Sequence, residues 1–265
     1  MRKSAAAAVT ASGVVALSAL LTPAAFAADA PQAPTMTSVT VNAGQDIVIS
    51  DLTQYLDVPI AETAQAKSGV AGMSVALWHG RNFATDLDGL LLSSPKQQCT
   101  TVNVTTTSCT DVITIQHSLK ADWGNPASEN DFAGQWHVDV IVSDNKGRVT
   151  EDHKYATVKI VRKATVTAEA SAKQIRKGKN VTFTGSLQRL DLDTNEFQGY
   201  DGASAQLQFA KEGTNAFTTV ATVKAKNGKL SATVAANKDG RWRWSYAGDK
   251  TTSTATSPVQ FVNVV

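Results

Sequence analysis

The chain contains 265 residues, with 25 basic and 23 acidic side chains and only two cysteines. This length is enough for one large domain or for two ordinary domains. Beyond the first 27 residues, no stretch approaches the ~18 consecutive apolar residues of a membrane span, and a zinc site would need more ligands than two cysteines supply.

The first 27 residues match a secretory signal peptide. A short basic segment precedes an apolar run over 5–21, and Ala25-Phe26-Ala27 supplies the small residues of a cleavage site. We expect a disordered, Pro/Ala-rich N-terminal tail over 28–35 after cleavage. The pattern therefore predicts a secreted, extracellular protein.

Residues 36–163 are predicted to form an irregular β-sandwich. Alternation of apolar residues predicts strands at 38–42, 46–50, 72–78, 112–119, 135–143 and 155–161. Leu52, Tyr55 and Leu56 follow helical spacing, so a short helix is expected within 51–66. Glycine, asparagine and proline over 123–131 predict a loop.

Cys99 and Cys109 are predicted to form a disulfide bond, because two nearby cysteines in an exported protein most simply pair with each other. The bridge closes a loop of about 11 residues, which stabilises the fold by up to ~3 kcal/mol in the chain-entropy model. The segment between the cysteines is rich in threonine and valine, and we expect it to form a hairpin.

Two predicted strands begin in the same way, with a glycine followed two residues later by a tryptophan and then by apolar residues at every second position. Their first residues, Gly134 and Gly240, are 106 residues apart. In the second strand, Trp242, Trp244 and Tyr246 share one face and two arginines occupy the other. This partition favours a buried aromatic face over an exposed platform for sugar rings. The repeat itself predicts two tandem β-sandwiches.

Residues 164–265 are predicted to form the second sandwich. Strands are expected at 164–170, 180–190, 205–210, 218–224, 229–235, 241–246 and 259–264, with glycine-containing turns between them. Seven strands in about 100 residues match an immunoglobulin-like sandwich. The overall prediction is therefore an all-β chain of two tandem β-sandwich domains, the second immunoglobulin-like.

A resemblance rests on Ile175-Arg-Lys-Gly-Lys-Asn-Val-Thr-Phe-Thr-Gly185 and on Asp239-Gly-Arg-Trp-Arg-Trp-Ser-Tyr-Ala-Gly-Asp249. Over residues 134–265 the chain resembles secreted actinobacterial proteins of the Streptomyces type, largely uncharacterised, that carry a C-terminal immunoglobulin-like domain. The resemblance implies that fold, and it raises calcium as a ligand because some of those proteins are described as calcium-binding. It transfers no catalytic residue.

A calcium site is one hypothesis for the second half. Asp191 and Asp193 place carboxylates at alternate positions, as an EF-hand loop does, but Glu196 and Gly202 stand where that loop needs a glycine and a bidentate acid. A sandwich loop could still gather Asp191, Asp193 and Asp201 around a hard cation. The alternative is an ordinary polar loop without a cofactor.

Two further sets of residues are candidates for binding. Trp78 and Trp123 lie beside predicted turns and are free to be exposed to a sugar ring. A basic cluster at a predicted turn could bind phosphate or carboxylate groups of a wall polymer, or could be a solvated edge; it consists of Lys173, Arg176, Lys177 and Lys179. No aromatic residues interleave with it, which argues against nucleic acid.

The two halves differ in charge. Residues 28–163 carry 10 basic and 15 acidic side chains, whereas residues 164–265 carry 13 basic and 8 acidic side chains. Opposite charges could dock the domains on each other or give the second domain an anionic partner. Two solvated surfaces of ordinary charge explain the difference equally simply.

The sequence predicts no catalytic residues and no enzyme. The four histidines form no metal-binding spacing, although His137 and Asp139 share a strand face and could form a hydrogen bond. A nucleophile elbow, a P-loop and a dinucleotide fingerprint are all missing. A catalytic triad of serine, histidine and aspartate can nevertheless form from residues that are far apart in the sequence.

The function expected from the sequence is therefore non-catalytic. The first hypothesis is a secreted binding or structural protein of the cell envelope or extracellular matrix, whose partner is a cell-wall polymer or an extracellular protein. The alternatives are a carbohydrate-binding module, a calcium-binding secreted protein, and a protease inhibitor that presents the loop between Cys99 and Cys109.

Overall fold

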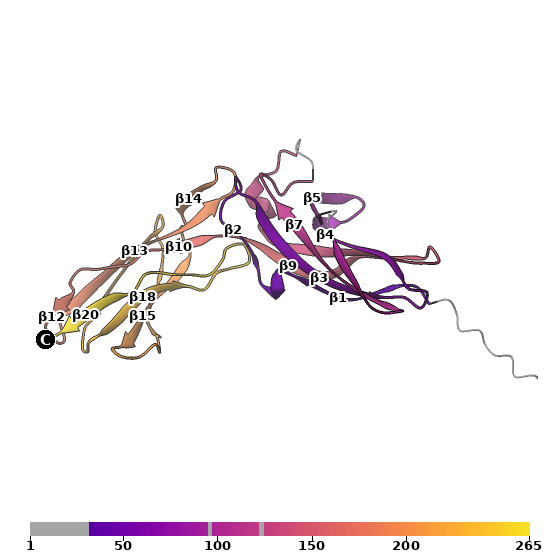
Figure 1. Cartoon of the computed structure of the whole chain (residues 1–265). Coiled ribbons are helices and arrows are strands. Elements are labelled where there is room, and N and C mark those ends of the chain that lie inside the picture. Colours follow the sequence, from indigo (N-terminus) through magenta and orange to yellow (C-terminus); the bar gives the residue numbers. More distant parts are fainter. Residues whose placement is uncertain (1–31, 95–96, 122–124) are drawn as a thin grey trace, which may run out of the picture. The chain divides into compact units, whose positions relative to one another are not determined.

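The computed structural model describes residues 32–94, 97–121 and 125–265 (Figure 1). The predicted signal peptide and Trp123 lie outside these residues. Apart from two short 3-10 helices, η1 (Asn42–Gly44) and η2 (Glu129–Phe132), every regular element in these described ranges is a strand. Within the described residues, no helix is long and apolar enough to cross a lipid bilayer.

The first half forms two sheets. One is antiparallel and has the order β1 (Thr35–Val41), β3 (Leu56–Gln65), β7 (Thr106–Ile115) and β6 (Gln98–Asn103). The other has the order β2 (Ile47–Ile49), β9 (Val149–Arg162), β8 (Gly134–Asp144), β4 (Val70–Asn82) and β5 (Asp86–Leu92). Only β2 and β9 run parallel in this second sheet.

A hydrophobic core lies between these two sheets. The inward residues alternate along strands such as β3 and β7, as half-buried strands require. Trp136 is fully buried among them, with its indole Nε1 donating a hydrogen bond of 2.7 Å to the carbonyl of Phe132. Both sheets contribute, for example through Leu77 and Ile113.

The short helix expected within 51–66 is wrong, because β3 occupies most of that segment. Val58, Ile60, Glu62 and Ala64 are buried at every second position, and the strand pairs with both β1 and β7. Helical spacing was a weak signal here, since Tyr55 is 71% exposed. The alternation of buried residues, together with hydrogen bonds to two neighbouring strands, favours a strand more than three residues at helical spacing favour a helix.

The second half forms an immunoglobulin-like sandwich. One sheet is built on β13 (Asn180–Asp191), which pairs with β10 (Ala164–Val166), β11 (Glu169–Ala170), β14 (Glu196–Gly199) and β17 (Lys229–Ala235). The other has the order β12 (Gln174–Ile175), β20 (Gln260–Val264), β18 (Gly240–Tyr246), β15 (Ser204–Lys211) and β16 (Thr218–Lys224), with β19 (Ala255–Thr256) beside β18. These orders correspond to the A-B-E and G-F-C-C′ sheets of the immunoglobulin fold.

The aromatic face of β18 lies in the core of this sandwich, as predicted. Trp242, Trp244 and Tyr246 are 4%, 0% and 5% exposed. Phe183 of the opposite sheet stacks on Trp242 with 4.6 Å between ring centroids. On the other face, Arg241 and Arg243 are half-buried, and the guanidinium of Arg243 lies 3.9 Å from the ring centroid of Phe217.

The two glycines that open the tryptophan-led strands are needed for different reasons. Gly134 adopts a φ of +148°, which L-residues with a side chain rarely adopt. Gly240 has no such φ, but an added Cβ would lie 2.2 Å from the ring of Phe209 and 2.5 Å from the carbonyl oxygen of Ala210. The sequence repeat therefore reflects backbone conformation at one position and close packing at the other.

Candidate functional site

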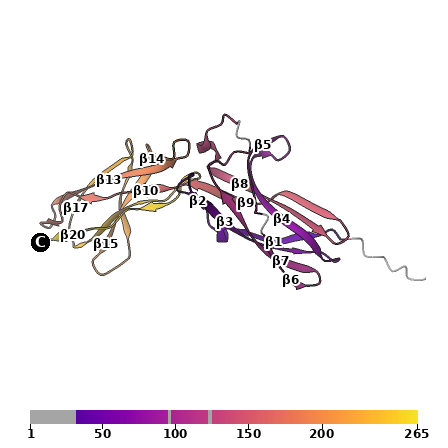
Figure 2. The same cartoon turned by 45° about the horizontal axis from the view of Figure 1, so that its top comes forward.

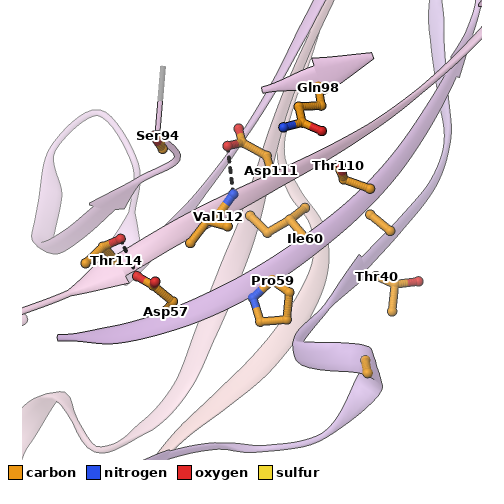
Figure 3. A pocket seen from close by; sticks show the side chains of 12 residues that line it. Thr40, Asp57, Pro59, Ile60, Ser94, Gln98, Thr110, Asp111, Val112 and Thr114 are labelled. Atoms are coloured by element: carbon orange, nitrogen blue, oxygen red, sulfur yellow. Dashed lines mark hydrogen bonds between the residues drawn. The ribbon is translucent and has the colours of Figure 1, made fainter. Parts of the chain in front are cut away.

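A groove lies on the outer face of the sheet β1-β3-β7-β6. Two adjoining hollows, of about 780 and 450 Å³, share four exposed residues. These residues form one row across the four strands, because Thr40 pairs with Ala61, Ala61 with Thr110, and Thr110 with Gln98. The two hollows therefore form one groove across the sheet, and Figure 3 shows the side chains that line the larger of the two.

A second row lines the groove next to this one. Ser38 pairs with Thr63, Thr63 with Ser108, and Ser108 with Thr100, so every strand presents a hydroxyl group. The hydroxyls of Thr63 and Ser108 lie 2.9 Å apart and hydrogen-bond to each other. The row can both donate hydrogen bonds to a ligand and accept them.

The other end of the groove combines a small apolar surface with one exposed carboxylate. Pro59 pairs with Val112, and Asp57 pairs with Thr114. The Thr114 hydroxyl donates a 2.7 Å hydrogen bond to Asp57 Oδ1 (Figure 3). The lining is therefore mostly neutral and its side chains are short, which suits an extended, uncharged chain.

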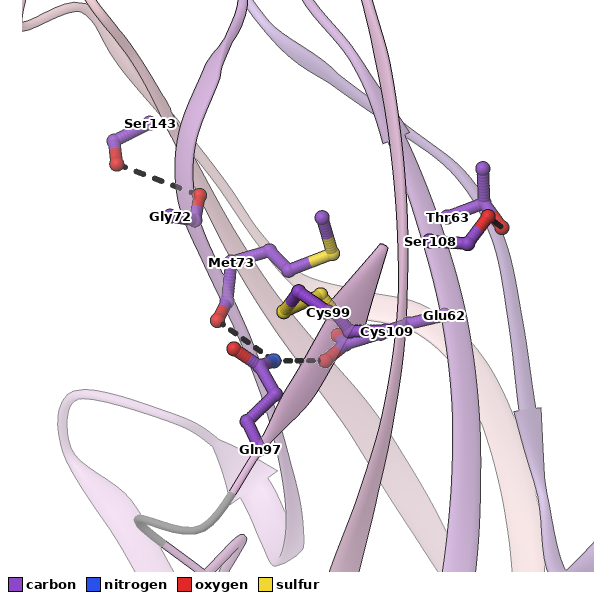
Figure 4. The surroundings of a disulfide bond; sticks show 9 residues. All are labelled: Glu62, Thr63, Gly72, Met73, Gln97, Cys99, Ser108, Cys109 and Ser143. Carbon is purple, nitrogen blue, oxygen red and sulfur yellow. Dashed lines mark hydrogen bonds between the residues drawn. A yellow bond between two sulfur atoms is a disulfide. The ribbon is translucent and has the colours of Figure 1, made fainter. Parts of the chain in front are cut away.

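Two further acidic residues of the same strands also line these hollows, but both are buried. Glu62 is 1% exposed and Asp111 is 6% exposed. The Gln97 amide donates hydrogen bonds to Glu62 Oε1 and, at 3.1 Å, to the carbonyl of Met73, whereas Glu62 Oε2 is buried without a partner (Figure 4). Burial, reinforced by the charge of Asp111 and opposed by the hydrogen bond from Gln97, raises the pKa of Glu62 to about 7.

The disulfide bond between Cys99 and Cys109 is confirmed (Figure 4). The two cysteines are directly opposite each other on β6 and β7, with 4.1 Å between their Cα atoms. The predicted hairpin between them is also confirmed, with its turn between Asn103 and Thr106. The segment is paired sheet rather than a separate protruding loop, which gives the protease-inhibitor hypothesis no support.

The prediction that Trp78 is free to be exposed is wrong. Its side chain is 0% exposed, because β4 extends to Asn82 and the residue lies within the strand rather than beside a turn. His137 stacks on it at 4.5 Å between ring centroids, and Phe83 contacts it edge-on at 5.5 Å. Its indole Nε1 donates a hydrogen bond to the carbonyl of His153.

A histidine–aspartate pair that the sequence did not indicate lies in the same region. Asp139 Oδ1 forms a 2.7 Å hydrogen bond with Nδ1 of His153, so its partner is His153 and not His137, with which it could also have paired. Burial, together with the charges of Lys154 and His79, lowers the pKa of His137. The pairing of Asp139 depends on the register of β8 and β9, and residue spacing carries no signal for it.

The three aspartates of the calcium hypothesis each accept hydrogen bonds from backbone amides. Asp191 accepts from Asp193 at 3.1 Å, Asp193 accepts from Glu129 at 2.7 Å, and Asp201 accepts from Asn227 at 2.6 Å. Across residues 32–94, 97–121 and 125–265, no three His, Cys, Asp or Glu residues form a group that could hold a metal ion. Calcium binding stays a prediction, and these contacts do not support it.

The basic cluster surrounds the short strand β12. Its four members are exposed; they are Lys173, Arg176, Lys177 and Lys179. Lys177 lines a hollow of about 550 Å³ in which acidic and basic residues mix, including Glu212 and Lys238. An anionic polymer at this cluster stays a prediction.

Comparisons with known proteins add similarities at the level of the fold. No protein-family model matches the chain, and no curated protein matches it. Among solved structures, murine CEACAM1b is 12% identical with a TM-score of 0.35, over 86% of this chain and 100% of that one. The D0–D1 domain of Intimin is 15% identical with a TM-score of 0.28, over 86% and 98% of the two chains. The Yersinia pseudotuberculosis adhesin InvE is 14% identical with a TM-score of 0.27, over 87% and 59%.

Proposed function

We propose that the protein is a secreted, non-catalytic binding protein of the cell envelope or extracellular matrix, and that it binds a neutral glycan chain in the groove of the disulfide-bonded sheet. The observation that carries the proposal is the row of four exposed residues shared by the two hollows, one from each strand, because it makes the groove continuous across the sheet.

The chemistry of the lining supports this class of ligand. Hydroxyl and amide groups dominate the two rows, and they match the hydroxyl groups of a sugar chain in both donor and acceptor roles. Asp57 supplies one exposed carboxylate at the end of the groove. Recognition would rest on hydrogen bonds, since the groove-lining residues include no aromatic side chain.

The disulfide bond supports the proposed location. Disulfides form and persist in oxidising compartments outside the cytoplasm, and this one connects the two strands that form one side of the groove. It holds β6 in position relative to β7, so that less conformational entropy is lost when a ligand binds.

The test is a binding assay of the mature protein with soluble neutral glycans and with insoluble wall material. Ala61→Arg places a long cation in the middle of the groove, and we expect it to weaken binding at least tenfold, which is ~1.4 kcal/mol. Ser231→Arg is the matched control, because Ser231 is also exposed within a strand but lies in β17.

Two results would reject the proposal. One is the absence of binding to every neutral glycan and wall fraction, and the other is unchanged binding by Ala61→Arg. Binding that disappears at high salt and on replacement of Lys177 and Lys179 would instead indicate an anionic polymer at the basic cluster.

A further inference from the structure

Strand β6 is covalently attached to its neighbour although it contributes nothing to the hydrophobic core. All six of its residues, Gln98–Asn103, are exposed, whereas β7 buries Cys109, Asp111 and Ile113. Hydrophobic burial therefore does not hold β6 in place. The backbone hydrogen bonds to β7 and the disulfide hold β6 in place at the edge of the sheet (Figure 2).

The outer edge of β6 carries free backbone groups. The Cα atoms of Cys99 and Cys109 are 4.1 Å apart, which identifies them as a non-hydrogen-bonded pair of an antiparallel ladder. The N–H and C=O of Cys99 therefore point away from β7, and those of Thr101, two residues along, do the same. In the described part of the chain, no strand pairs with this edge.

This edge also lacks the usual protection against pairing. Exposed edge strands are normally blocked by charged residues or proline. Strand β5, one edge of the opposite sheet, follows this rule, since it carries Asp86 and Asp88. Strand β6 has neither a charge nor a proline, and Val102 beside the turn is 60% exposed.

We propose that β6 pairs antiparallel with β6 of a second copy of this chain, about a twofold axis that passes beside Thr100. A second copy fits because the edge is complementary to itself: it is neutral, so identical strands meet without repulsion of like charges. Cys99 of one copy then lies opposite Thr101 of the other, which gives about four inter-chain hydrogen bonds.

The pairing joins two four-stranded sheets edge to edge. Because Gln98 and Thr100 end the two groove rows on β6, the outer faces of the two copies become neighbours. This pairing does not depend on what the groove binds, since its inter-chain hydrogen bonds come from the backbone of β6.

Crosslinking by an introduced cysteine tests this register. The twofold axis puts Thr100 opposite itself at a Cα separation that a disulfide spans. We expect Thr100→Cys to form a covalent dimer under mild oxidation and Thr110→Cys to form little. Thr110 is the matched control, because it is exposed on the same face and is likewise adjacent in sequence to a native cysteine, but it lies on β7. Equal dimer yields from both variants would overturn the register.

Sedimentation velocity over a range of protein concentrations tests the association itself. We expect a reversible dimer for the unmodified protein and a monomer for Thr101→Pro, because proline removes the N–H group that the second copy needs. Near-ultraviolet circular dichroism checks that the variant stays folded. A monomeric unmodified protein at high concentration, or a dimer that persists in folded Thr101→Pro, would overturn the proposal, including the case in which β6 binds a strand of another protein.

Discussion

The ionisation of Glu62 opposes the fold. Its carboxyl is buried, one oxygen has no partner, and its pKa rises from an ordinary value of 4.5 to about 7. The folded state therefore holds the proton more tightly than the unfolded chain does. This contribution to stability is complete below about pH 4.5 and is lost as the pH rises towards 7.

The first prediction follows from the raised pKa of Glu62. We expect Glu62→Gln to raise the melting temperature at pH 8 but to change it little at pH 4, since the amide is neutral at both. The gain in free energy of unfolding at pH 8 is at most ~3 kcal/mol. Thermal melts across this pH range measure it, with Glu196→Gln, on the exposed strand β14, as the control. Parallel pH profiles for the unmodified protein and Glu62→Gln would contradict the prediction.

The hairpin of β6 and β7 shows how an element can be ordered without being buried. Interior strands such as β3 are held by neighbours on both sides and by the core. Strand β6 has a partner on one side only, and its exposed residues gain nothing from hydrophobic burial. Its order therefore depends on the disulfide more than the order of any interior strand does.

The second prediction concerns this element. We expect the double variant Cys99→Ala/Cys109→Ala to open β6 locally and to lower the free energy of unfolding by up to ~3 kcal/mol. Hydrogen exchange at low protein concentration measures the opening, because amides of Gln98–Asn103 should exchange faster while those of β3 stay protected. A uniform increase in exchange across both strands would indicate global destabilisation instead.

At the scale of the whole molecule, the described residues form two hydrophobic cores, which differ in the parts of the chain that supply them. Every residue of the second core lies between Ala164 and Val262. The first core takes most of its residues from Met36 to Ile160, but it also includes Leu190 and Leu192. The boundary predicted between residues 163 and 164 stays a prediction, and the second half has the more self-contained core.

The third prediction uses this asymmetry. We expect the fragment 164–265 to unfold cooperatively by itself, because its core is complete. A fragment of residues 36–163 lacks Leu190 and Leu192, and it should melt at a lower temperature than the same residues do in the intact chain. Calorimetry of both fragments measures this. An unfolded 164–265 fragment would show that the second core needs the first half.

Much of the fold was predictable because its signals are local. Alternation located most strands, and β16 and β17 match their predicted bounds of 218–224 and 229–235. Two cysteines left a single possible pairing, and the faces of β18 followed from the alternation of aromatic and basic residues. The missed strand β3 shows the limit, since its pairing partners lie far away in sequence.

The sequence by itself therefore determined the all-β class, the disulfide and the aromatic core of the second sandwich, because strand period and a unique cysteine pair need no tertiary information. Only the tertiary structure decided the burial of Trp78, the pairing of Asp139 with His153, and the rows of the groove. Each of these depends on the register between strands, which side-chain packing sets across segments distant in the chain.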